Sequence, residues 1–194
     1  MKPTAILEIR DLYGEALLAG SGSGQAFFSK LVDATKDLPR DAVIALNFTK
    51  VEVVTASFFR SAFRAFRDYA RSTPMFFPVF ANTNATTREE IAFFAEGSGD
   101  AFIFGTLTKA GDLKSSFVLG NLDAKQSKAL KVLVELGEAD AGQLRETYPE
   151  DPEVSSAAWS NRLAVLAAKG FAIERMVGRS KKYRPIIEEL TYGP

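Results

Sequence analysis

The pattern of apolar and polar positions predicts alternating strands and helices over the first 119 residues. Period-two alternation and continuous apolar runs between turn residues indicate strands, whereas apolar residues three and four positions apart indicate helices. The predicted strands cover residues 5–10, 41–48 and 74–83, the predicted helices residues 25–38, 57–72 and 86–97, and a hairpin residues 101–120. Strand–helix alternation that ends in a hairpin predicts a mixed sheet with helices packed on it, an α/β fold.

Three local signals refine this half of the chain. Thr86 and Glu89 have the spacing of a capping box, which predicts a helix that begins there and ends at Gly97. Pro78 cannot donate a ladder hydrogen bond, so its strand is expected to be irregular or at a sheet edge. The glycine–serine stretch at 20–24 predicts a flexible turn into a helix. A phosphate-cradling loop is the alternative, although the stretch lacks the Gly-Lys-Ser/Thr ending of a P-loop.

From residue 123 onward the pattern changes to three helices and a second hairpin. The predicted helices cover residues 123–136, 140–146 and 155–169, and the predicted strands residues 171–176 and 181–186. Residues 120–124 form a predicted linker, and residues 148–154 a proline-broken turn. Asp140 is the expected cap of the short helix, and Gly137 the expected end of the helix before it. The sequence therefore predicts two domains, residues 1–119 and 120–194.

Composition limits the chemistry available to this chain. Of its 194 residues, 46% are hydrophobic and 25% are charged, which is typical of a folded globular protein. It has no cysteine and no histidine, which excludes disulfides, cysteine nucleophiles, Ser-His-Asp triads and zinc centres. We expect no enzyme and no cofactor; an enzyme that uses Asp and Glu is a third alternative, for which no paired-carboxylate motif is found. No apolar run reaches membrane-spanning length and no signal segment is recognised, so we expect a cytoplasmic protein.

Positive charge is concentrated in one segment of a chain whose formal net charge is zero. Between Val154 and Ile187 there are seven basic residues and one acidic residue, Glu174, which gives a local charge of +6. Such segregation is typical of a surface that contacts the phosphate backbone of a nucleic acid. The candidate DNA-contacting residues are Ser156, Ser160, Asn161, Arg162, Arg175, Arg179, Lys181 and Lys182.

The helix predicted over residues 155–169 has two distinct faces. Trp159, Leu163 and Leu166 share one face at helical spacing, so we expect them in the core. The opposite face is small and polar, as a helix that enters a DNA major groove requires. There Asn161 could pair with adenine, and Ser160 with several base edges or with phosphate. An ordinary solvent-exposed helix face is the alternative.

The stretch SNRLAVLAAKGFAIERMVGRSKKYRPI resembles the recognition helix and wing of winged helix-turn-helix regulators of the multiple-antibiotic-resistance type. The matching residues are Arg162, Leu163, Leu166, Lys169, Gly170, Gly178, Arg179 and Tyr183. The resemblance covers roughly residues 123–187. It implies a helix in the DNA major groove and a basic wing beside it, with Arg179 and Lys181 near the wing tip. Some winged helices bind only proteins, so a protein-docking use stays open.

The stretch AVIALNFTKVEVVTASFFRSAF resembles STAS-like domains, relatives of bacterial anti-sigma factor antagonists. The resemblance spans roughly residues 5–119. It places Ser57 where that family carries a phosphorylatable serine, in the first turn of a helix. The antagonists have Asp-Ser-Ser-Gly at this point, whereas this chain has Thr-Ala-Ser-Phe, so the acid and the glycine are missing.

Four arginines follow Ser57 on the same predicted helix. The four arginines form one stripe along the helix: Arg60, Arg64, Arg67 and Arg71. Beside the stripe lies a predicted apolar face, formed by Phe59, Phe63, Phe66 and Ala70. A phosphate on Ser57 could accept charge-assisted hydrogen bonds from Arg60. In the alternatives, Ser57 is simply an N-cap and the arginines are a solvated face, or the stripe docks an acidic partner.

These features favour a two-domain prokaryotic transcription regulator, in which a STAS-like domain senses or docks a partner and a winged helix contacts DNA. The alternative is a protein-interaction module of an anti-sigma or partner-switching system, with the winged helix used for protein docking or dimerisation. The expected partners are double-stranded DNA, a protein at the STAS-like domain and a second copy of the chain. No membrane partner is expected.

Overall fold

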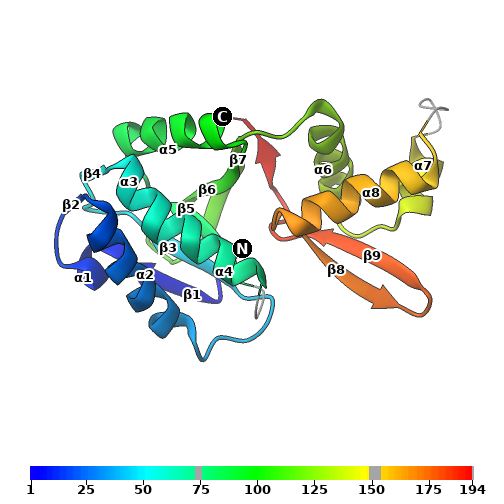
Figure 1. The fold of residues 1–194 in the computed structure, drawn as a ribbon. Coiled ribbons are helices and arrows are strands. Elements are labelled where there is room, and N and C mark those ends of the chain that lie inside the picture. Colours follow the sequence, from blue (N-terminus) through cyan, green and yellow to red (C-terminus); the bar gives the residue numbers. More distant parts are fainter. Residues whose placement is uncertain (73–75, 149–153, 194) are drawn as a thin grey trace. The chain divides into compact units, whose positions relative to one another are not determined.

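The computed structural model describes residues 1–72, 76–148 and 154–193. Its chain forms two compact units. The first comprises Met1–Asn121 together with Gly193, and the second comprises Leu122–Tyr192. Each unit has its own set of helices and strands (Figure 1).

A mixed, mostly parallel sheet organises the α/β fold. Within the first unit its strands have the order β1-β3-β5-β6-β7, in which the neighbours from β1 to β6 pair in parallel and β6 pairs antiparallel with β7. These strands are β1 (Ala5–Glu8), β3 (Val43–Asn47), β5 (Phe77–Ala81), β6 (Ala101–Leu107) and β7 (Leu113–Gly120), and the two-residue strand β10 (Thr191–Tyr192) belongs to the second unit. A small parallel pair, β2 (Leu17–Leu18) and β4 (Val53–Val54), lies outside this sheet.

Helices of the first unit pack on the sheet through phenylalanine side chains. These helices are α1 (Ile9–Tyr13), α2 (Ser21–Thr35), α3 (Ala56–Phe59), the π-helical turn η1 (Arg60–Arg64), α4 (Ala65–Ser72) and α5 (Ala85–Ser98). The elements α3, η1 and α4 form one continuous helical run beside α2 (Figure 1). Phe63 sits at the centre of the core, where its ring contacts those of Phe27, Phe48 and Phe80. The predicted apolar face of this run is confirmed, since all four of its residues are buried.

Two of the local predictions in this unit are wrong. The helix α5 is capped by Asn84, whose side chain accepts a hydrogen bond from the backbone of Thr87, and it ends at Gly99; the Thr86–Glu89 capping box is therefore not the start of this helix. The predicted flexible turn at residues 20–24 is the first turn of α2, with Gly20 at the N-cap.

The strand that contains Pro78 is central rather than at an edge, because β5 lies between β3 and β6. Pairing of β5 with β6 involves only Phe80 and Ala81, whereas Phe77 donates its backbone N–H toward β3, to Ala42. Successive residues of a strand direct their backbone groups to opposite sides, so the missing N–H of Pro78 falls on the β6 side. There the ladder has not yet begun, and the proline costs no hydrogen bond.

The second unit contains three helices followed by an antiparallel hairpin, as the sequence pattern predicts. Its elements are α6 (Ala124–Leu136), α7 (Ala141–Thr147), α8 (Ser156–Ala168), β8 (Ala172–Val177) and β9 (Ser180–Pro185). The predicted end of α6 at Gly137 and the predicted cap of α7 at Asp140 are both confirmed. Of the turn expected at residues 148–154, residues 149–153 lie outside the described residues.

Candidate functional site

The β8–β9 hairpin presents two chemically different faces. Residues directly opposite each other in an antiparallel ladder share a face. The register pairs Arg175 with Lys182 and Val177 with Ser180 on one face, and Met176 with Lys181 and Glu174 with Tyr183 on the other. The two adjacent lysines at positions 181 and 182 are therefore on opposite faces.

On the face that carries Met176 and Glu174, Lys181 is neutralised within the hairpin. Its Nζ lies 2.8 Å from Oε1 of Glu174, and the buried Tyr183 donates its hydroxyl to Oε2 of the same carboxylate at 3.0 Å. The hydrogen bond from Lys181 lowers the pKa of Glu174, so this carboxylate is charged at neutral pH. Burial, together with the adjacent carboxylate, raises the pKa of Tyr183 to about 12. This face carries little net charge.

The other face, which we call the cationic face, is formed by Arg175 and Lys182 directly opposite each other. In the described residues neither side chain has an acidic partner, and the same holds for Arg179 in the exposed two-residue turn. Like charges placed opposite each other destabilise a ladder. An anion bound between them would remove that repulsion, so this face is the strongest candidate for a phosphate contact.

The base of the hairpin is fixed to the helices of its own unit. Phe171, Ile173 and Tyr183 are all buried. Ala139, which follows α6, exchanges two backbone hydrogen bonds of 2.9 Å with Tyr183. Gly170 ends α8 with a φ of 81°, a conformation that favours glycine, and leads directly into β8. The base of the hairpin is therefore held by α6 through Ala139 and follows directly from the end of α8.

The exposed side of α8 is small and polar. Asn161 is exposed, and Ser156 and Ser160 are half-buried. Ser155 is the N-cap, and its Oγ accepts a hydrogen bond from the backbone of Ala158. Together these side chains leave no large residue at the start of the helix to hold a ligand away.

The opposite side of α8 is buried, which confirms the prediction that its apolar residues lie in the core. Trp159, Leu163 and Leu166 are all buried. The guanidinium of Arg162 lies 4.8 Å from the centroid of the Trp159 ring, a cation–π geometry that restricts the arginine. Arg162 is half-buried, so its charge is held at the edge of the helix rather than extended freely into solvent.

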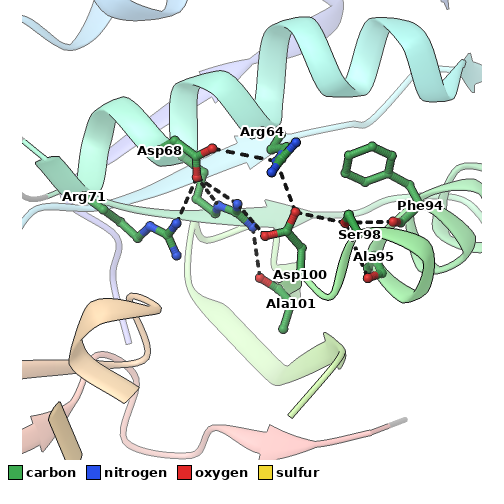
Figure 2. Close-up of polar contacts among 9 residues, drawn as sticks. Arg64, Asp68, Arg71, Phe94, Ala95, Ser98, Asp100 and Ala101 are labelled. Carbon is green, nitrogen blue, oxygen red and sulfur yellow. Dashed lines mark hydrogen bonds and ion pairs between the residues drawn. The ribbon is translucent and has the colours of Figure 1, made fainter. Parts of the chain in front are cut away.

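In the first unit, three arginines of the predicted stripe, Arg64, Arg67 and Arg71, form an ion-pair cluster (Figure 2). Arg64 Nε lies 3.1 Å from Oδ2 of Asp100, and Arg71 Nη2 lies 2.9 Å from Oδ1 of Asp68. Ser98 at the end of α5 donates to Asp100 at 2.9 Å. The cluster therefore joins α4, α5 and the start of β6 within this unit.

Arg67 is the centre of this cluster and is only 5% exposed. Its Nη2 lies 2.8 Å from a carboxylate oxygen of both Asp68 and Asp100, and its guanidinium lies 4.4 Å from the Phe102 ring centroid. Burial acts to raise the pKa of Asp100, but the charge of Arg67 and the hydrogen bonds from Ser98 and Arg67 outweigh it, so the pKa is lowered. The expectation of a solvated arginine face is wrong for Arg67.

Ser57 is exposed at the second residue of α3. The N-cap is Thr55, whose side chain accepts from the backbone of Phe58, so the alternative in which Ser57 is the cap is wrong. Of the four arginines, Arg60 is exposed and takes part in no ion pair described for the chain; its guanidinium lies 5.9 Å from the Phe94 ring centroid. One helical turn separates Ser57 from Arg60, which leaves this arginine available to a phosphate on the serine.

The described ranges contain no group of His, Cys, Asp and Glu that could hold a metal ion. They also contain no helix long and apolar enough to cross a membrane. Comparison with protein-family models and with curated proteins finds no match to the chain.

Proposed function

We propose that the second unit is a winged helix that binds duplex DNA, and that the chain is a prokaryotic transcription regulator. The observation that carries this proposal is the cationic face, where Arg175 and Lys182 oppose each other without an acidic partner among the described residues. Two cations held directly opposite each other repel, and an anionic phosphate bound between them would offset that repulsion. Phosphate contacts of this kind position a protein on DNA without reading its sequence.

The helix α8 supplies the element that reads bases. Its exposed side carries Asn161, which has the donor and acceptor needed for a bidentate pair with adenine, and the smaller Ser160 beside it. Because α8 and the hairpin share one core, a helix in the major groove and cations on the neighbouring backbone can act as a single surface. The order of three helices and a hairpin is that of a winged helix.

For the first unit we propose a STAS-like sensing or docking domain. Support comes from its mixed, mostly parallel sheet and from the exposed Ser57 at the start of a helical run. An exposed aromatic side chain adds to this support: Phe93 on α5 is 77% exposed, and Glu89, Glu90 and Glu96 occupy helical positions next to it. An apolar residue framed by carboxylates suits a protein partner with a basic, partly apolar surface.

The proposal is tested by titrating the full chain with a mixed-sequence duplex over a series of salt concentrations. Counterion release predicts that log K falls linearly with log salt, with a slope of about −0.9 for each phosphate contacted. With contacts from Arg175, Arg179 and Lys182, we expect a slope of about −2 to −3. A duplex affinity that is absent, or that does not change with salt, would favour the alternative of a protein-docking module.

A further inference from the structure

The tip of the hairpin carries two apolar side chains that make no contribution to the core. Met176 is 62% exposed and Val177 is 51% exposed, directly before the turn formed by Gly178 and Arg179. Consecutive strand residues point to opposite faces, so the tip is apolar on both sides. The fold of the hairpin is fixed at its base, and it does not require these two side chains.

Positive charge surrounds this apolar tip. Arg175 and Lys182 lie one step below it on the cationic face, and Arg179 lies in the turn itself. The matching ligand has a negatively charged rim and an apolar interior. The minor groove of DNA has this character, because two phosphate backbones flank a floor of sugars and base edges, and proteins that enter it insert apolar side chains between base steps.

The hairpin tip is wider than the minor groove that it would enter. The minor groove is about 6 Å wide, whereas a β-layer with side chains on both faces occupies roughly 10 Å, the spacing of packed sheets. The tip can enter only where the groove opens and a base step unstacks. We propose that Met176 and Val177 form an apolar wedge that opens the minor groove and bends the bound duplex. This inference rests on the proposed DNA-binding function.

A wedge of this kind makes binding depend on how easily the DNA sequence under the hairpin tip can be deformed. Pyrimidine–purine steps unstack most easily, whereas A-tracts are stiff and keep a narrow minor groove. The wedge therefore predicts tighter binding to a duplex with a TA step under the hairpin tip than to an A-tract of the same length. This preference is separate from any base contact made by Asn161.

An anionic lipid surface would also attract a cationic hairpin with an apolar tip. Membrane binding scales with the apolar surface buried, and even a single long acyl chain gives only marginal attachment. Met176 and Val177 together bury less apolar surface than such a chain. The observations therefore favour DNA, and lipid binding becomes an outcome of the test.

The test uses the full chain and two matched duplexes, one with a central TA step and one with an A-tract. The TA duplex carries 2-aminopurine in place of the adenine of that step, because its fluorescence rises when it unstacks, and dyes at the two ends report the bend. The wild type is compared with the double variant Met176→Ser, Val177→Ser. The control is Leu17→Ser, which removes a 52% exposed apolar side chain of the first unit, outside the hairpin.

We expect the wild type and Leu17→Ser to raise the fluorescence and shorten the end-to-end distance. The double variant should lose both effects and the TA preference, yet keep the salt slope. Salt-dependent binding without unstacking or bending in the wild type overturns the wedge and leaves the proposed function standing. Absence of duplex binding overturns both. Sedimentation with anionic lipid vesicles that is lost in the double variant, without DNA distortion, reassigns the tip to lipid.

Discussion

Arg175 and Lys182 occupy directly opposite positions in the β8–β9 ladder, while Lys181, next to Lys182 in the chain, is paired with Glu174 on the other face. Hence only part of the local charge of this segment is available to a ligand. The available part lies on one face of a ribbon whose base is fixed to α8.

Glu174→Gln should increase DNA affinity. The carboxylate neutralises Lys181 at a distance of 2.8 Å, and its lowered pKa keeps it charged at neutral pH. Removing that charge adds one available cation, so we expect the salt slope to become steeper by about one unit. If affinity and slope stay at the wild-type values, Lys181 does not reach a phosphate even when it is released.

Trp159→Ala should destabilise the second unit. The indole is fully buried in the core of α8, and truncating such a side chain costs about 3–5 kcal/mol. Denaturant unfolding measures this loss. A variant that kept its stability but lost DNA affinity would instead show that the indole contacts the ligand.

Two glycines of α2 should respond in opposite ways to alanine. A Cβ at Gly24 would lie 2.9 Å from the backbone oxygen of Phe58 and 3.0 Å from Cβ of Ser61, so Gly24→Ala should cost about 1–3 kcal/mol. A Cβ at Gly22 meets no atom within 4 Å, and Gly22→Ala should stabilise by up to about 1 kcal/mol because alanine is the better helix former. Equal effects on thermal stability would contradict the close packing of α2 on α3 and η1.

Asp100→Asn should destabilise the first unit by about 3 kcal/mol at neutral pH, because it leaves the buried Arg67 with fewer acidic partners. The pKa of Asp100 is lowered in the folded state, so its stabilising effect is complete above the unfolded carboxyl pKa of about 3.9. The effect is lost as the pH falls through the lower folded pKa.

The control for this prediction is Asp68→Asn. Asp68 also contacts Arg67, but its side chain is 44% exposed, so solvent screens its charge and Asp68→Asn should cost less than Asp100→Asn. Unfolding of both variants is followed from neutral to acid pH. A difference between wild type and Asp100→Asn that persists unchanged at low pH would show that the loss does not arise from the carboxylate charge.

The features predicted from sequence were those whose causes are local. The end of α6 at Gly137, the cap at Asp140 and the burial of Trp159 follow from residue type and helical spacing alone. The central position of Pro78 depends on where β6 begins to pair with β5, which no local pattern contains. The cap at Asn84 could have been found, because asparagine is a strong N-cap residue, but the Thr–Glu spacing two residues later obscured it.

The candidate site, too, was predictable from sequence only where its cause is local. A count of charges indicates the basic segment but not its two faces, because the partner of Lys181 is set by the cross-strand register. Successive side chains of a strand point to opposite faces, and this rule, applied to Glu174, Lys181 and Lys182 together, could have separated the two faces. The role of the arginine stripe was not predictable, since Asp100 lies 33 residues from Arg67 and meets it only when β6 is in place.

The central claim is tested most directly by two neighbouring single variants, Lys182→Ala and Lys181→Ala, each titrated with the same duplex over a range of salt concentrations. The variants remove identical side chains from opposite faces of the hairpin. We predict that Lys182→Ala reduces the magnitude of the salt slope by about one unit and weakens binding to all duplexes equally. Lys181→Ala should leave the slope nearly unchanged, because that charge is already neutralised. A wild-type affinity that does not depend on salt, or an equal loss in both variants, would contradict the assignment of the cationic face to DNA.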